Sequence, residues 1–134
     1  MLKFAALLTL VATPALADQL VFFQAPSKNI FCMIATGAWP EARCDIMQMT
    51  SKIPPAPADC DLDYGHAFSI GRQDTKGQRV CAGDTVADQN SMTLGYGDHI
   101  DVGGFRCSSE KTGMTCTNPA GHGFTIARAT QKLF

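Results

Sequence analysis

A histidine between two glycines is the first group in this sequence that could take part in chemistry. Gly121 and Gly123 flank His122, and glycine allows backbone conformations in which a ligand can approach closely. The same glycines could instead form the turn into a strand that begins at Phe124. Because a functional histidine usually has a second polar group within reach, we favour the turn and keep His122 as a candidate binding residue.

Two polar runs have spacings that resemble metal sites. His99 and Asp101 share one face of an extended segment, but zinc requires three or four protein ligands. Residues 59–63 carry carboxylates at alternate positions, as in the first half of a calcium loop. However, Tyr64 stands where that loop requires glycine, and Ile70 stands where it requires glutamate. We therefore interpret both runs as solvated surface, and we expect no metal and no cofactor.

Motifs for nucleophilic catalysis are absent from the sequence. It contains neither GxSxG nor HExxH, and no free thiol is expected if every cysteine is paired. Arg43 and Asp45 are expected to share a strand face, where a salt bridge with neighbours is favoured over catalysis. We assign no catalytic residue and do not expect an enzyme.

Six cysteines form the strongest pattern in the chain. An even number in an oxidising compartment predicts disulfides, and the absence of CxxC disfavours a redox motif or a zinc ribbon. Six cysteines allow fifteen connectivities, so strand patterning must narrow the choice. The six residues are Cys32, Cys44, Cys60, Cys81, Cys107 and Cys116.

Alternation along two hairpins favours pairs between sequence neighbours. Pairing Cys32 with Cys44 across an antiparallel hairpin makes one face wholly apolar, since Ile30 then faces Ile46. Phe31, Met33, Arg43 and Asp45 then share the other face. Pairing Cys107 with Cys116 likewise makes an apolar face with Phe105 and Met114, and it centres the turn on residues 111–112, with Gly113 available for a positive φ.

The remaining pair, Cys60 with Cys81, would tie a proline-rich loop at residues 54–57 to the sheet. We expect a third hairpin from residues 68–70 and 79–81, with Cys81 opposite Phe68. Each disulfide should contribute about 3 kcal/mol to stability, partly by restricting the unfolded chain.

The N-terminus has the features of a cleaved signal peptide. Lys3 provides the positive charge, residues 4–12 are apolar, and residues 14–17 end in the small-x-small pattern that signal peptidase cleaves. We expect residues 1–17 to be removed and residues 18–134 to form one domain in the periplasm or outside the cell. No stretch approaches the roughly 20 apolar residues of a membrane span. A formal net charge of −1 also makes nucleic acid a poor partner.

Short apolar or alternating runs between glycines and prolines predict an all-β fold. The chain has 12 glycines and 7 prolines, which disfavours long helices. We expect a small disulfide-stapled antiparallel sandwich or barrel built of hairpins. Residues 84–92 are ambiguous between a loop and a helical turn. The expected strands lie at residues 20–23, 30–35, 42–47, 67–70, 78–82, 99–102, 105–108, 114–117 and 124–127.

Several blocks together resemble an uncharacterised family of small exported bacterial proteins. They cover nearly the whole chain after the leader, at residues 26–32, 43–46, 81–85, 94–97, 105–107, 113–118 and 121–128. Tyr64 stands where tryptophan is more usual in that family, a departure that affects packing more than chemistry. The resemblance implies export and three disulfides, and it implies no activity.

The best functional hypothesis is a binding or inhibitor-type module that presents a rigid loop to a protein or small-molecule ligand. A preordered loop reduces the entropy cost of association, and residues 108–112 are the candidate contact. The alternatives are a small cell-envelope hydrolase that uses His122 with a nearby carboxylate, and a passive envelope component without a specific ligand. The candidate binding residues are Ser109, Lys111, His122 and Arg128.

Overall fold

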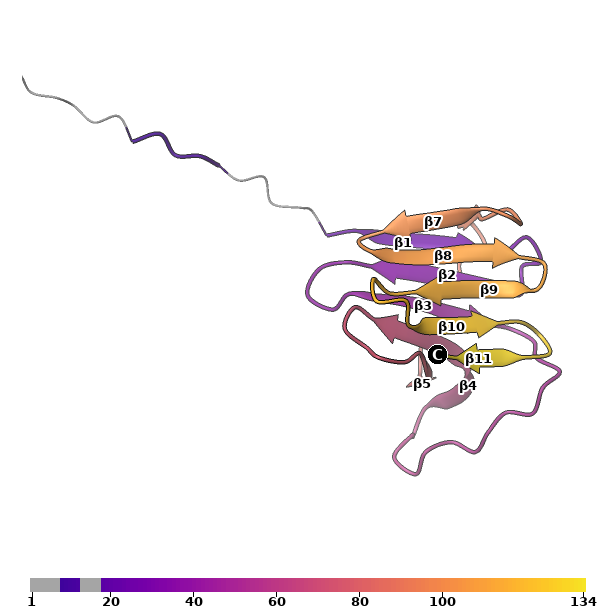
Figure 1. Ribbon diagram of the computed structural model, residues 1–134. Coiled ribbons are helices and arrows are strands. Elements are labelled where there is room, and N and C mark those ends of the chain that lie inside the picture. Colours follow the sequence, from indigo (N-terminus) through magenta and orange to yellow (C-terminus); the bar gives the residue numbers. More distant parts are fainter. Residues whose placement is uncertain (1–7, 13–17) are drawn as a thin grey trace, which may run out of the picture.

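Two β-sheets pack face to face in this computed structural model, which describes residues 8–12 and 18–134 (Figure 1). The first sheet has the order β5 (Gln78–Ala82), β4 (Asp63–Gly71), β3 (Glu41–Ile46), β2 (Ile30–Ala35), β1 (Leu20–Gln24) and β6 (Met92–Thr93). The second has the order β11 (Gln131–Leu133), β10 (Gly123–Ile126), β9 (Gly113–Thr117), β8 (Phe105–Glu110) and β7 (His99–Val102). The predicted all-β class is confirmed, and of the two predicted architectures the fold is the sandwich.

Side-chain alternation places the core between the two sheets. The predicted register of the β2–β3 hairpin is confirmed, with Ile30 opposite Ile46 and Cys32 opposite Cys44. In the second sheet, β8 and β9 pair with Cys107 opposite Cys116. Because successive residues of a strand point to opposite faces, each hairpin presents one apolar face to the other sheet. Phe23, Phe68, Phe105 and Phe124 are fully buried there.

Three disulfides cross-link the fold in the predicted pattern. They join Cys32 to Cys44, Cys60 to Cys81 and Cys107 to Cys116. The first and third lie in opposite sheets, and the Sγ atoms of Cys44 and Cys116 approach within 3.6 Å at the centre of the core. The Cys60–Cys81 bridge ties the long β3–β4 connection to β5, outside the core.

The predicted register between β4 and β5 is wrong. Phe68 lies opposite Arg79, whereas Cys81 lies opposite Tyr64, beyond a bulge between Tyr64 and Ala67. Gly65 occupies this bulge at a φ of 125°. An extra residue on one strand breaks the simple ladder. The β4–β5 turn also has its own hydrogen bonds, including Gly71 N to Asp74 Oδ2 at 2.7 Å, and these make it a compact loop rather than a regular strand extension.

The connection between β5 and β6 crosses the outer face of the first sheet. Residues 83–91 contain no helix and are called the strap below. The Gln24 side chain donates to the carbonyl oxygens of Gln89 and Ser91, and the Val86 side chain of the strap is buried. Through the strap the chain reaches β6, which pairs in parallel with β1. Neither β6 nor β11 was expected from the sequence, since both are too short to show a pattern.

Most of the predicted leader lies outside the described residues. Of its residues only 8–12 are described, and Leu8, Leu10 and Val11 are largely exposed there. Next to the first strand, Gln19 and Thr36 exchange two hydrogen bonds. In the described ranges, no helix has the length and apolar character needed to cross a bilayer.

Candidate functional site

A small pocket opens at one end of the sandwich, where three turns meet. We call it the end pocket, and its volume is about 160 Å³. The β1–β2, β8–β9 and β10–β11 turns surround it. Successive turns between antiparallel strands lie at opposite ends of a sheet, so every second turn lies at the same end of the sandwich. Its walls are formed by Ala25, Ser27, Asn29, Ile30, Tyr96, Ser109, Glu110, Lys111, Gly113, Met114, Ala127 and Arg128.

Three of the four predicted binding residues line this pocket. Ser109, Lys111 and Arg128 come from two different hairpins and meet there. Lys111 occupies the two-residue β8–β9 turn with Thr112, as predicted, and Gly113 follows at a φ of 139°. The fourth residue, His122, lies in the β9–β10 turn at the opposite end of the sandwich (Figure 1).

Ser109 is buried, although its place near the tip of the β8–β9 hairpin suggested an exposed side chain. It continues the inward alternation of Phe105 and Cys107, and it is only 1% exposed. Its hydroxyl oxygen has no hydrogen-bond partner among the described residues. Most buried polar side chains are hydrogen-bonded, so this hydroxyl is an exception, and its oxygen is shielded from solvent on every side, the pocket included.

Hydrogen bonds fix the walls of the end pocket. The backbone nitrogen of Gly97 donates to the carbonyl oxygen of Ser109 at 2.7 Å, and the backbone nitrogen of Ser109 donates to the carbonyl oxygen of Asp98 at 2.9 Å. The Asn29 side chain exchanges two hydrogen bonds with the backbone of Gln48. On the far wall, Thr50 donates to the carbonyl oxygen of Arg128 at 2.8 Å. The pocket is therefore preorganised.

Charge and hydrophobicity are separated within the end pocket. Ala25, Ile30 and Met114 are buried and form an apolar interior. The exposed cations Lys111 and Arg128 lie at the mouth with a single carboxylate, Glu110. Neither cation forms an ion pair with any described residue. The mouth thus has an excess of positive charge on a chain whose net charge is slightly negative.

His122 has the geometry of the predicted turn. Its backbone nitrogen donates to Asn118 Oδ1 at 3.1 Å, and its carbonyl oxygen accepts from Asn118 N at 2.8 Å. Gly121 has a φ of 87°. A Cβ on Gly123 would overlap the carbonyl oxygen of Cys116. The two glycines are therefore explained by the turn and by close strand packing, without reference to a ligand.

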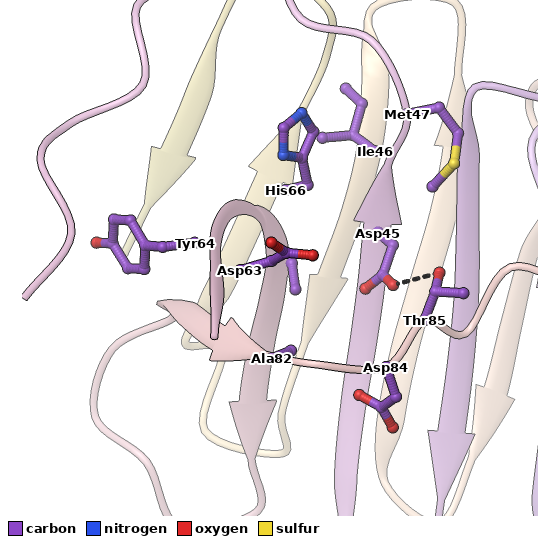
Figure 2. Close-up of a pocket in the computed structure, with 10 residues that line it drawn as sticks. Asp45, Ile46, Met47, Asp63, Tyr64, His66, Ala82, Asp84 and Thr85 are labelled. Carbon is purple, nitrogen blue, oxygen red and sulfur yellow. Dashed lines mark hydrogen bonds between the residues drawn. The ribbon is translucent and has the colours of Figure 1, made fainter. Parts of the chain in front are cut away.

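A larger and more open pocket lies beside β3, β4 and the start of the strap. Its volume is about 410 Å³, and Figure 2 shows its polar side chains. Asp63 and His66 line it together with Asp84, but no hydrogen bond joins His66 to a carboxylate within the described chain. Sequence reasoning missed this grouping, because it depends on the bulge in β4 and on the path of the strap.

An ion-pair network at the edge of this larger pocket holds the strap. Arg43 donates to Asp45 at 3.0 Å and to Asp84 at 2.9 Å. A salt bridge of these strand residues with their neighbours was predicted from the sequence. Asp45 also accepts from Thr85 Oγ1 and from Val86 N, at 2.8 Å and 3.1 Å. The hydrogen bond from Arg43 holds the pKa of the Asp84 carboxyl below its ordinary value of 3.8. Every bond of the network joins β3 to itself or to the strap, so its role is structural.

Among the described residues, neither of the two metal-like runs forms a cluster of three possible metal ligands. His99 Nε2 lies 3.3 Å from the exposed Asp101 carboxylate, and Arg106 donates to the same carboxylate at 2.7 Å. These hydrogen bonds, chiefly those from Arg106, lower the pKa of Asp101. In the core, the sulfur atoms of Cys32, Cys44 and Cys116 lie within 4.8 Å of one another. All three belong to disulfides, so none is available as a thiolate ligand.

Comparison with known proteins gives one match. A family model described as a family of unknown function, DUF6636, matches residues 3–134, nearly the whole chain. No curated protein and no solved structure matches the chain.

Proposed function

The chain belongs to DUF6636, a family of unknown function, and we propose that it is a binding protein whose ligand enters the end pocket. The observation that carries this proposal is the meeting of Ser109, Lys111 and Arg128 around a preorganised cavity. A rigid site that combines an apolar interior with a few convergent polar groups is typical of ligand binding.

A binding pocket fits the geometry better than an inserted inhibitory loop does. The β8–β9 turn consists only of Lys111 and Thr112, so it protrudes little beyond the strands. An inhibitor that enters an enzyme's cleft needs a longer exposed loop. For hydrolysis by His122, the hydrogen bonds of the described chain provide no side-chain partner for the imidazole.

We place this binding protein in an oxidising compartment outside the cytoplasm. Three disulfides favour such a compartment. Export through a signal peptide at residues 1–17, with a domain that begins at Asp18, accounts for this location. N-terminal sequencing of the protein recovered from the producing cell tests this part of the proposal, and a retained Met1 would contradict it.

Nuclear magnetic resonance of the oxidised, ¹⁵N-labelled protein tests the site. A panel of small carboxylates, amines, sugars and short peptides is titrated in turn. We expect at least one class to shift the backbone amides of Ser109, Gly113 and Arg128, and we expect Lys111→Ala to reduce these shifts. Lys76→Ala is the matched control, since Lys76 is an exposed lysine in the β4–β5 turn at the other end. Shifts confined to other regions would contradict the proposal.

A further inference from the structure

We infer that the long connection between β3 and β4 presents a polyproline II helix to a groove lined by aromatic side chains on a partner protein. The helix comprises residues 53–57, called the proline segment below. None of these residues lines the end pocket, so the inference is independent of the proposed function and can fail without it.

The β3–β4 connection is long and is anchored at both ends. Sixteen residues, 47–62, separate the two strands, and loops of this length without secondary structure are usually functional or disordered. Here Ser51 Oγ donates to Gln131 Oε1 at 2.7 Å on one side, and a disulfide joins Cys60 to Cys81 on the other. Figure 1 shows the connection extending beyond the sandwich near β4 and β5. The anchors therefore hold an exposed loop in a fixed place.

Prolines determine the conformation of the proline segment. Proline fixes φ at about −65° at positions 54, 55 and 57, and a residue that precedes proline is kept extended, which applies to Ile53, Pro54 and Ala56. No peptide bond of the described residues is cis, and no backbone–backbone hydrogen bond involves residues 52–56 within the described chain. An extended run of trans prolines without internal hydrogen bonds adopts the polyproline II helix.

One edge of this helix rests on β4, and another edge is open. A Cβ on Gly65 would overlap Ile53 Cγ2, so the Ile53 side chain packs against the bulge in β4. Because polyproline II has three residues per turn, Pro54 and Pro57 share a different edge, about 9 Å apart. Residues 52–59 are all exposed. The helix thus displays these two proline rings to solvent.

An aromatic-lined groove matches this surface. In such a groove, proline rings pack against aromatic side chains, and tryptophan or tyrosine donates to backbone carbonyl oxygens. The carbonyl oxygens of residues 52–56 accept no backbone hydrogen bond within the described chain. Since the helix is already formed, docking costs little conformational entropy. Residues 53–58 are also all apolar and exposed, and such a contiguous patch marks an interaction site.

Charges of opposite sign flank the proline segment. Lys52 precedes it, whereas Asp59 and Asp61 follow it. None of the three forms an ion pair with a described residue. Complementary charges fix the register and direction of a docked segment. The partner's groove therefore has carboxylates at the end that receives Lys52 and cations at the other end.

Nuclear magnetic resonance tests the docking with two aromatic-lined grooves, those of an SH3 domain and a WW domain. Each domain is titrated into the oxidised, ¹⁵N-labelled protein. We expect at least one domain to shift the backbone amides of Lys52, Ile53 and Ala56. The same domain with its groove tryptophan changed to alanine should cause no shift. If neither domain shifts these amides, the inference is wrong.

Proline variants assign the binding to the proline segment. The double variant Pro54→Ala, Pro57→Ala should weaken binding about tenfold, because it removes both rings from the open edge. Pro119→Ala is the matched control, since Pro119 is an exposed proline in the β9–β10 turn, and it should leave the affinity unchanged. Circular dichroism verifies that both variants are folded. An unchanged affinity for the folded double variant would overturn the inference.

A free peptide tests the role of the anchors. Residues 51–58 are synthesised with blocked ends and titrated with the same domain. We expect the natural protein to bind at least about threefold more tightly than the peptide, since its segment is held in place. Equal affinities would overturn the claim that the anchored loop presents the segment.

Lysine variants test the direction of docking. For a domain with carboxylates beside its groove, Lys52→Glu should weaken binding about threefold, as expected for an exposed charge pair. Lys76→Glu, at an exposed lysine in the β4–β5 turn, should leave the affinity unchanged. Equal effects of the two variants would overturn the assigned direction.

Discussion

At the scale of single residues, the pair of Arg43 and Asp45 couples the strap to the sheet. Both side chains are at least nine-tenths buried, and Asp45 accepts four hydrogen bonds. A buried charge is tolerated when its partners satisfy it, and it becomes strongly destabilising when one partner is removed. The exposed Asp84 contributes to the same network under solvent screening, which weakens its contribution.

The variants Asp45→Asn and Asp84→Asn should therefore differ in stability. We expect Asp45→Asn to lower the free energy of unfolding by about 3 kcal/mol, because Arg43 loses its buried counter-charge. Asp84→Asn should lower it by less than about 1 kcal/mol, as exposed pairs generally do. Urea denaturation of the oxidised proteins measures both values, and similar losses in the two variants would contradict this account.

Acid should weaken the strap through Asp84. Its folded pKa lies below 3.8, and its unfolded pKa is near 3.8, so below that pH the unfolded state binds more protons. The contribution of Asp84 is fully present above 3.8 and is lost as the pH falls through the folded pKa. We expect the stability of Asp84→Asn to decline less steeply than that of the natural protein below about pH 4. If the urea midpoints of the variant and the natural protein fell equally as the pH was lowered, this prediction would be wrong.

At the scale of elements, β10 is positioned by close contact with β9. Gly123 pairs with Thr117, and its Cα lies against the backbone of Cys116. This contact leaves no room for a side chain. Gly121 has a positive φ of 87° with no atom near its Cβ position, so it needs glycine only for conformation.

Alanine at these two positions should have unequal effects. We expect Gly123→Ala to lower the free energy of unfolding by about 3 kcal/mol or more, because backbone atoms in a ladder cannot move aside. Gly121→Ala should cost about 1–2 kcal/mol for the left-handed conformation. Thermal and urea unfolding give the comparison, and a smaller loss for Gly123→Ala would show that the strands can separate at this point.

At the scale of the whole molecule, the three disulfides divide into two classes by burial. Cys32, Cys44, Cys107 and Cys116 are fully buried. Cys81 is exposed, and Cys60 is partly exposed. A reductant can therefore reach the Cys60–Cys81 bridge in the folded state, whereas the other two require global unfolding.

Partial reduction should reveal this order. Under a mild reductant followed by alkylation, we expect Cys60 and Cys81 to be modified at least about tenfold faster than the four buried cysteines. Peptide mapping by mass spectrometry identifies the sites. Denaturant should make the modification rates of all six cysteines similar. Equal rates without denaturant would contradict the division of the disulfides into an exposed and a buried class.

Local alternation made much of the fold predictable, and long-range pairing limited the rest. Opposing cysteines and isoleucines were sufficient to give the β2–β3 register. The same alternation from Phe105 through Cys107 places Ser109 inward, although its proximity to a turn favoured an exposed position. The bulge at Gly65 and the parallel pairing of β6 with β1 depend on contacts far apart in sequence. The end pocket likewise combines three turns that no local pattern connects.

The contact between Cys44 and Cys116 has a consequence for production of the protein. If either core disulfide opens, its thiolate lies 3.6 Å from a sulfur of the other, within range of exchange. Exchange would join Cys44 to Cys116 and leave Cys32 and Cys107 as thiols. Once an oxidant joins those two thiols, the product is an isomer that links the two sheets covalently and has the same mass as the native form. Recombinant protein therefore needs an isomerase or a redox buffer during oxidation. The intact mass alone cannot distinguish the isomer from the native form.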